Sequence, residues 1–105
     1  MKIALDYDGT FTADRVMWSK FVRDARDRED HSVTFVTSRH DGPGNDDIES
    51  DARDLRVLVV YCGGRQKASC YTADIWIDDM PELIPSLDAL RAMTLGCERM
   101  GDTTP

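Results

Sequence analysis

The chain has 105 residues, of which 41% are hydrophobic and 31% charged, a composition typical of a single globular domain. Thirteen basic side chains against 20 acidic ones give a net charge of −7, which argues against a protein that coats nucleic acid. No apolar run approaches the roughly 18 residues of a membrane-spanning helix, and Asp6 comes too early for a signal peptide. We therefore expect a cytoplasmic protein without a membrane partner.

The first half of the chain alternates between strand and helix patterns. A short apolar strand is predicted at 2–5, and a helix follows from Asp14, whose side chain is a typical N-terminal cap. The apolar residues of this helix recur at the spacing of one buried helix face, namely Trp18, Phe21, Val22 and Ala25. A second buried strand is predicted at 32–36, and the glycines and proline of 39–45 predict a loop.

The second half repeats this alternation. The expected elements are a helix from about Asp46 with Ile48, Ala52 and Leu55 on one face, a strand at 57–61, a short helix at 66–72, a strand at 75–77, and a last helix from Pro81 or Glu82 to Met93 with Leu83, Ile84, Leu87 and Leu90 inward. Apolar strands separated by helices indicate a parallel sheet that is covered on both faces. The connection between the third and fourth strands is short, near the lower limit for a crossover that contains a helix.

Four chemically distinctive groups each follow one of the apolar strands. Because the carboxyl ends of parallel strands share one edge of the sheet, where ligands bind, we expect these groups to converge there. In chain order they are Asp6 and Asp8, Thr37-Ser38-Arg39, Gly63-Gly64-Arg65-Gln66-Lys67, and Asp78-Asp79. Carboxylates in this number suit a hard cation such as Mg²⁺, and hydroxyl, ammonium and backbone N–H groups suit the oxygens of a phosphate. An aspartate nucleophile can form an aspartyl-phosphate, and a second aspartate can serve as acid and base.

The segment Asp6-Tyr7-Asp8-Gly9-Thr10-Phe11 resembles the DxDGT signature of the haloacid-dehalogenase-like (HAD) phosphatases. The resemblance continues in chain order, with Thr37 at the second motif, Lys67 at the third and Asp78-Asp79 at the acidic fourth, and it covers residues 2 to about 90. It implies a three-layer Rossmann-like core with a parallel sheet of about four strands in the order 3-2-1-4 and helices on both faces. The domain would span 1–95, and 96–105 would be a loose tail.

The resemblance also implies a role for each matching residue. Asp6 would attack phosphorus, and Asp8 would protonate the leaving oxygen and then activate water. Thr37 would bind the phosphoryl group, and Lys67 would neutralise it and orient Asp6. Mg²⁺ would be held by the Asp6 carboxylate, the Asp8 main-chain carbonyl and Asp78, whereas Asp79 would orient the site or reach the metal through water.

Four further residues are candidate phosphate or substrate contacts: Thr10, Ser38, Arg39 and Arg65. Simpler readings stay open for several of the candidates. The two arginines can be surface residues, Thr37 a strand-end hydroxyl, Lys67 a surface lysine, and Asp78-Asp79 the cap of a helix that starts at Pro81.

Many HAD enzymes insert a cap domain after the first or second motif, but 9–36 and 38–66 are too short to hold one besides the expected core elements. An uncapped site would admit a bulky substrate, such as a nucleotide or a phosphorylated nucleic-acid end, or a second copy of the chain would cover it. We therefore predict a Mg²⁺-dependent phosphomonoester hydrolase. The alternatives are a phosphotransferase, or an interaction module that binds Mg²⁺ and phosphate with little turnover.

Overall fold

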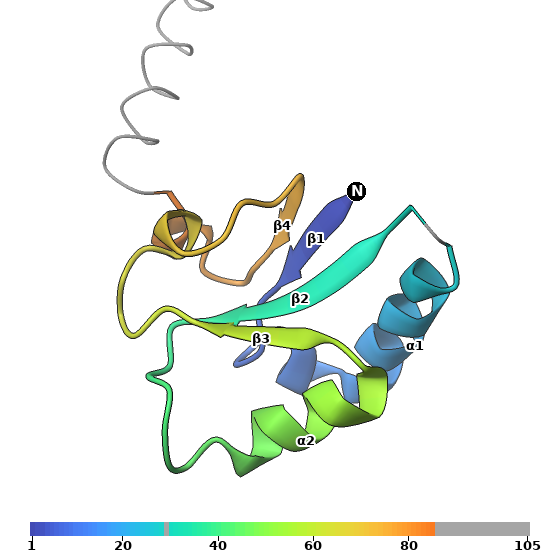
Figure 1. Ribbon diagram of the computed structural model, residues 1–105, viewed down its shortest axis with the longest axis horizontal. Coiled ribbons are helices and arrows are strands. Elements are labelled where there is room, and N and C mark those ends of the chain that lie inside the picture. Colours follow the sequence, from blue (N-terminus) through green and yellow to red (C-terminus); the bar gives the residue numbers. More distant parts are fainter. Residues whose placement is uncertain (29, 86–105) are drawn as a thin grey trace, which may run out of the picture.

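Four parallel strands form one sheet in the computed structural model, which describes residues 1–28 and 30–85 (Figure 1). The strands are β1 (Lys2–Leu5), β2 (Ser32–Thr37), β3 (Leu58–Tyr61) and β4 (Ile75–Ile77), and their order across the sheet is β3-β2-β1-β4. All three neighbouring pairs are parallel. The prediction of a small α/β domain with this strand order is confirmed.

Two helices connect the first three strands, α1 (Arg15–Arg26) and α2 (Asp46–Leu55). The predicted cap is present, because the side chain of Asp14 accepts a hydrogen bond from the Met17 N–H at 3.0 Å. Helix α2 ends at Leu55 and is followed by Arg56, which adopts a left-handed backbone conformation with φ of 57°. Neither helix is long and apolar enough to cross a membrane, and the same holds for every other helical segment of the described residues.

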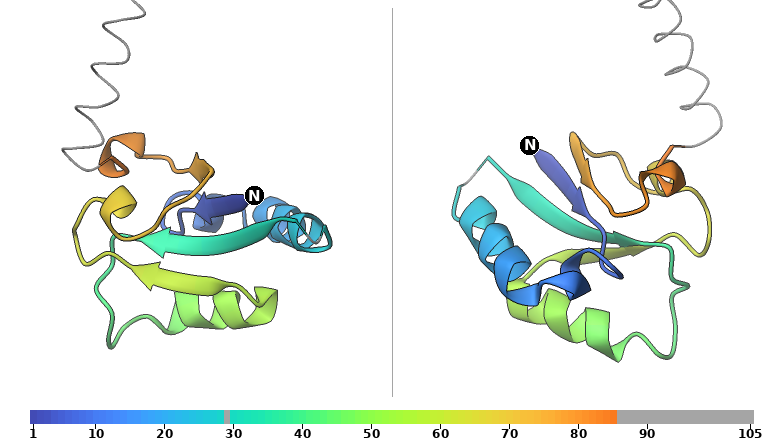
Figure 2. Two further views of the ribbon diagram at one scale, coloured as in Figure 1. Left: turned by 45° about the horizontal axis from the view of Figure 1, so that its top comes forward. Right: turned by 180° about the vertical axis from the view of Figure 1, so that it is seen from behind.

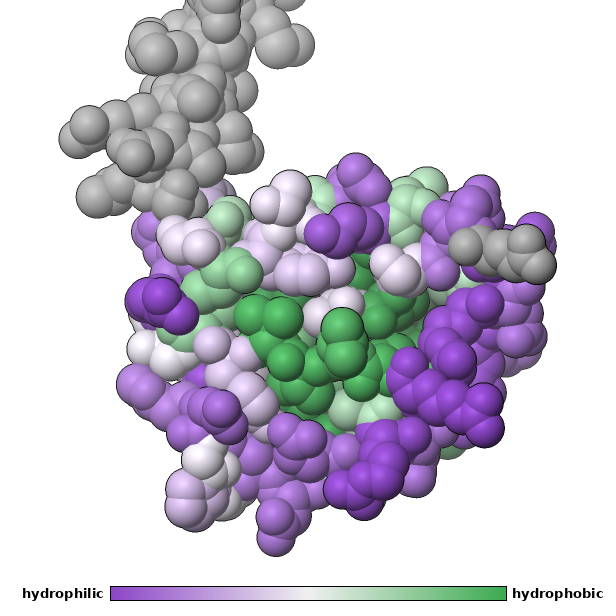
Figure 3. All heavy atoms as spheres, viewed as in Figure 1, coloured by the Kyte–Doolittle hydropathy of each residue, from purple (hydrophilic) through white to green (hydrophobic). Residues whose placement is uncertain are grey.

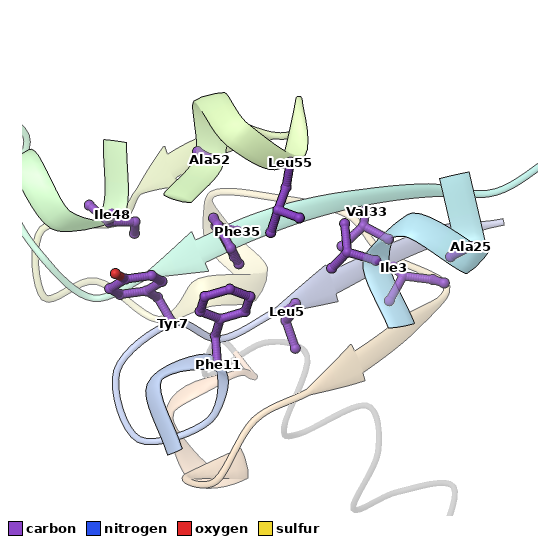
Figure 4. Packing of buried hydrophobic residues seen from close by; sticks show 11 residues of the cluster. Ile3, Leu5, Tyr7, Phe11, Ala25, Val33, Phe35, Ile48, Ala52 and Leu55 are labelled. Carbon is purple, nitrogen blue, oxygen red and sulfur yellow. The ribbon is translucent and has the colours of Figure 1, made fainter. Parts of the chain in front are cut away.

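Both helices pack on the same face of the sheet, around one hydrophobic core (Figure 4). Alternate strand residues point into this core, since side chains alternate between the two faces of a strand. Three aromatic rings lie at its centre, with Tyr7 stacked on Phe11 at 5.6 Å between ring centroids and both rings meeting Phe35 edge-on. The core therefore anchors the loop that follows β1, which carries the first acidic residues of the site.

The opposite face of the sheet is covered differently from what the sequence predicted. The helix expected at 66–72 is only a short 3₁₀ turn, η2 (Lys67–Ser69), so the described residues place both α-helices on one face and only this turn with its flanking loop on the other (Figure 2). The physical reason is length. The connection from β3, residues 62–74, must pass over β2 and β1 and return to the start of β4, and it is close to the minimum of about a dozen residues for a parallel crossover, which leaves little room for a helix.

The last predicted helix lies mostly outside the described residues. Its described beginning is a 3₁₀ turn, η3 (Pro81–Leu83), with proline at the first position. The Ala68 N–H donates a hydrogen bond to the Ile84 carbonyl, which ties this turn to η2. The rest of the helix predicted to Met93, and the tail predicted at 96–105, fall outside the described residues.

Candidate active site

The residues predicted to carry chemistry meet at the carboxyl edge of the sheet. Asp6 directly follows β1, Thr37 is the last residue of β2, and Lys67 begins η2. A small cavity of about 160 Å³ opens there, lined by Asp6, Asp8, Thr37, Ser38, Lys67, Asp78, Asp79, Met80 and Leu83. Three larger hollows, of about 460, 400 and 330 Å³, lie away from these residues. We place the site in the small cavity because the chemically reactive groups converge only there among the described residues.

Lys67 is buried between two carboxylates. Its Nζ lies 2.6 Å from Asp6 Oδ1 and 2.6 Å from Asp78 Oδ2, and only 2% of the lysine side chain is exposed. Burial alone would lower the pKa of Lys67, but the hydrogen bonds to Asp6 and Asp78 outweigh it and raise that pKa. Lys67 is therefore a fixed positive charge that joins the ends of β1 and β4, and the simpler reading as a surface lysine is wrong.

Asp79 completes the acidic group from the far side. The Thr10 hydroxyl lies 2.9 Å from Asp6 Oδ2 and 3.2 Å from Asp79 Oδ1, and it accepts a hydrogen bond from the Asp79 N–H at 3.1 Å. Thr10 itself is buried. The structure thus places the Thr10 side chain between two carboxylates, where it fixes their relative position; its predicted contact with substrate phosphate stays a prediction.

The three acids fit a divalent cation. One carboxylate oxygen from each of Asp6, Asp78 and Asp79 can be chosen so that all lie within 4.8 Å of one another. Burial raises the pKa of Asp6 to about 6, although its hydrogen bond to Lys67 works in the opposite direction. Hydrogen bonding lowers the pKa of Asp79, so the pKa values of these two neighbouring acids shift in opposite directions. Carboxylates forced this close are stabilised by a bound cation, and oxygen ligands are those that Mg²⁺ prefers.

Asp8 points to a different partner. Its two oxygens accept hydrogen bonds from Arg39, at 2.8 Å from Nε and 2.7 Å from Nη2. The same guanidinium donates to both oxygens of Asp47, at 2.7 and 2.9 Å, and lies over the Tyr7 ring at 5.3 Å. Arg39 lowers the pKa of Asp47 to about 2. The side chain of Asp8 therefore lies outside the three-acid group and in a bidentate pair at its rim.

The remaining candidates differ in their position. Thr37 is buried, and both Thr37 and Ser38 line the cavity, while the predicted contact of Thr37 with a phosphoryl group stays a prediction. Arg65 does not line the cavity; its Nε donates to the Cys62 carbonyl at 3.1 Å. The predicted substrate contacts of Ser38, Arg39 and Arg65 stay predictions.

Three residues of the site were missed by sequence reasoning. Asp47 holds Arg39 from the first turn of α2, and an acid at a helix start is too common to single out. Met80 and Leu83 form an apolar wall of the cavity although both side chains are partly exposed, at 46% and 37%. Nothing in their pattern separates them from helix residues that face a core.

The chain matches no model of a known protein family, and no curated protein and no solved structure is significantly similar to it. Fold and site together define a small α/β domain with an all-parallel four-stranded sheet and three clustered aspartates at its carboxyl edge.

Proposed function

We propose that the protein is a Mg²⁺-dependent phosphomonoester hydrolase of the HAD type, which acts through an aspartyl-phosphate on Asp6. The observation that carries the proposal is the arrangement of Asp6 with Lys67 and the acid pair after β4. A buried carboxylate is held there by a lysine at 2.6 Å, beside two further acids within reach of one cation. This arrangement accounts for all four motifs of the resemblance with one chemical reaction.

The proposed reaction has two steps. In the first, an Asp6 oxygen attacks phosphorus, the bond from phosphorus to the ester oxygen breaks, and Asp8 gives a proton to the departing oxygen. In the second, Asp8 takes a proton from water, the water oxygen attacks phosphorus, and the bond to Asp6 breaks. Inorganic phosphate leaves and Asp6 is regenerated. Lys67 opposes the negative charge of the phosphoryl group, and the hydroxyls of Thr37 and Ser38 bind its oxygens.

Mg²⁺ would be held by Asp6, by Asp78 and Asp79 directly or through water, and by the main-chain carbonyl of Asp8. When bound, it supplies the positive charge that lets the anionic phosphate ester approach the anionic Asp6. Without it, the three carboxylates outnumber the single ammonium of Lys67. The excess of negative charge would repel a phosphate, so metal and substrate binding should be coupled.

The substrate class follows from the size and walls of the cavity. A volume of about 160 Å³ accommodates a phosphoryl group and little else. The rest of the ester would lie at the mouth of the cavity, against the exposed parts of Met80 and Leu83. Within the described residues, the segments after β1 and β2 form α1 and α2 with their loops and no cap. A nucleotide or a phosphorylated nucleic-acid end fits an open site of this kind.

The test is phosphate release in Mg²⁺ and in EDTA from aryl phosphates, nucleotides, sugar phosphates, phosphopeptides and oligonucleotides phosphorylated at the 3′ or 5′ end. Asp6→Asn, which is close to isosteric but a poor nucleophile, is assayed alongside. Release that needs Mg²⁺ and is lost in Asp6→Asn is the expected result. Unchanged release by Asp6→Asn would rule out the covalent mechanism. A salt titration with the best substrate then separates a small molecule from a nucleic-acid end, because backbone contacts make affinity fall steeply with salt.

A second candidate function is supported by the outer surface of the sheet. Leu58 is 75% exposed, and Figure 3 shows apolar side chains gathered in the middle of the view, over the region of β2 and β3. Such a patch is typical of a surface that meets another protein or a second copy of the chain. A stable monomer with high turnover in analytical ultracentrifugation and activity assays would remove the reading as an interaction module.

A further inference from the structure

Arg39 forms more contacts with protein groups than a substrate-binding arginine at the mouth of a site needs. Four of its hydrogen bonds go to carboxylate oxygens, two on Asp8 and two on Asp47. A fifth, longer contact reaches the Asn45 side-chain oxygen at 3.4 Å. Bidentate pairs of this kind fix the plane of a carboxylate as well as its position.

The arginine is itself held from three sides. Asp47 belongs to the first turn of α2, whose Ile48, Ala52 and Leu55 are buried in the core, so it is a rigid anchor. The Tyr7 ring lies under the guanidinium and is fully buried in the core. Asn45 is also buried, and its side-chain nitrogen donates to the His40 and Gly42 carbonyls, both at 2.9 Å, which fixes the loop between Arg39 and α2.

Asp8, by contrast, sits on an exposed loop, and 54% of its side chain is accessible. Without the arginine, nothing among the described contacts would set the direction of its carboxylate. Arg39 therefore connects the carboxylate of Asp8 to the rigid parts of the fold. General acid–base catalysis depends on such positioning, because the proton must be handed over at hydrogen-bond distance.

We propose that Arg39 is a positioning residue that orients Asp8 for proton transfer to the leaving oxygen, with Asp47 and the Tyr7 ring as its support. This role rests on the proposed function, and it differs from direct substrate binding by Arg39. It predicts a signature of its own. Proton transfer matters greatly for a poor leaving group and little for a leaving group that is stable as an anion, whereas a binding contact to the phosphoryl group matters equally for both.

The test compares phenyl phosphate with 2,4-dinitrophenyl phosphate, which differ mainly in leaving-group stability, and measures kcat and KM of wild type and variants. We expect Arg39→Ala to lower kcat/KM on phenyl phosphate by about 100-fold, within the usual range for a lost acid–base group. We compare kcat/KM because it reports the first step alone, whereas the second step, in which Asp8 is the base, is common to both esters. The loss of kcat/KM on the dinitrophenyl ester should be at least about tenfold smaller. Asp8→Asn should give the same pattern, and adding Arg39→Ala to it should not widen the difference between the esters.

Three further variants sharpen the result. Arg15→Ala is the matched control, since Arg15 also contacts Tyr7 but pairs with Asp51 and not with Asp8, and it should affect both esters equally. Arg39→Lys keeps the charge but cannot form the two parallel hydrogen bonds, and should behave like Arg39→Ala. Guanidinium ion added to Arg39→Ala should restore activity on phenyl phosphate more than on the dinitrophenyl ester. Thermal melts check that each variant is folded.

Equal losses on the two esters, with a raised KM, would overturn the positioning role and assign Arg39 to substrate binding. Unchanged kinetics of Arg39→Ala would overturn it as well. Failure of the proposed function looks different, because the wild type would then release no phosphate from either ester in Mg²⁺, and the role would fall with it.

Discussion

Gly9 lies directly against Asp79. A Cβ atom at residue 9 would come within 2.6 Å of Asp79 Oδ2. The backbone of Gly9 has a φ of +82°, a conformation that residues other than glycine rarely adopt. The glycine of the DxDGT segment is thus required for two reasons at once, a left-handed turn after β1 and the close approach of an acid from the end of β4. Gly9 therefore allows the loop after β1, which carries the proposed nucleophile Asp6, to pack closely against the acid pair Asp78-Asp79.

We predict that Gly9→Ala raises the Mg²⁺ concentration needed for half-maximal activity at least severalfold, because the new methyl group must displace the Asp79 carboxylate. Gly64→Ala is the matched control. Gly64 has nearly the same φ, +81°, but its Cβ would meet no atom within 4 Å. Both variants should lose roughly 1–2 kcal/mol of stability through backbone strain, whereas only Gly9→Ala should change the Mg²⁺ requirement. Equal Mg²⁺ titrations of the two variants would contradict the prediction.

Removal of Lys67 should destabilise the protein in a pH-dependent way. Lys67→Met leaves Asp6 and Asp78 buried without their common partner, a change that typically costs about 3–5 kcal/mol. The pKa of Asp6 is already raised to about 6 by burial, and losing the ammonium raises it further. An acid whose pKa is raised on folding destabilises the protein above that pKa, and the cost is relieved as the pH falls and the acid takes up a proton.

Urea unfolding without metal at pH 7.5 and pH 5 measures this effect. We expect Lys67→Met to lose more stability at the higher pH, and Mg²⁺ to restore part of the loss. Lys20→Met is the control. Lys20 pairs with Asp24 at the same distance of 2.6 Å, but both side chains are well exposed, so the change should matter little at either pH. A loss for Lys67→Met that does not depend on pH would show that the cost comes from packing rather than from the carboxylates.

Much of the fold could be predicted from the sequence because local patterns and global architecture agree. The four apolar strands, the cap at Asp14 and the helix from Asp46 were predicted within one or two residues, since each is set by nearby side chains. The cover of the second face could not be predicted in this way. The helix expected at 66–72 is limited by the span that the chain must cross between β3 and β4, and that span depends on the strand order.

The candidate site could likewise be predicted only in part. Asp6, Lys67 and the acids after β4 were predicted to converge, because their places at strand ends follow from the topology, and the structure brings them together. The partners of Arg39 and Thr10 were not predicted. Their contacts join loops distant in sequence, 31 residues apart for Arg39 and Asp8 and 69 for Thr10 and Asp79, and no local spacing encodes them.

The thiol of Cys62 should resist modification in the folded protein. Cys62 is fully buried at the end of β3, and burial raises its pKa to about 12, so almost none of it is thiolate at pH 8. Cys70 is only partly buried. In a Cys97→Ser background, Ellman's reagent should therefore titrate one thiol in the native protein and the second only after denaturation. Adding Cys70→Ser should remove the native reaction, and rapid reaction of both thiols before denaturation would contradict the burial of Cys62.

The two acids after β4 should contribute differently to metal binding. Both oxygens of Asp78 are already hydrogen bonded, one to Lys67 and the other to the Met80 N–H at 2.9 Å. Asp79 Oδ1 contacts Thr10, whereas Oδ2 lies against Gly9 and accepts none of the hydrogen bonds found among the described residues. The resemblance points to Asp78 as the direct ligand, but the available oxygen belongs to Asp79.

We therefore expect Asp79→Asn to raise the half-saturating Mg²⁺ concentration more than Asp78→Asn does. Asp78→Asn should instead lower kcat at saturating Mg²⁺, because it loosens Lys67 and with it the orientation of Asp6. Mg²⁺ titrations of activity, together with calorimetric titration of Mg²⁺ into each variant, separate the two effects. The opposite order would mean that Lys67 gives up its Asp78 oxygen when the metal binds, so that the ammonium and the cation exchange partners at this carboxylate. In that case Asp79 would not bind the metal directly and would position Asp6 through its contacts with Thr10 and Asp6.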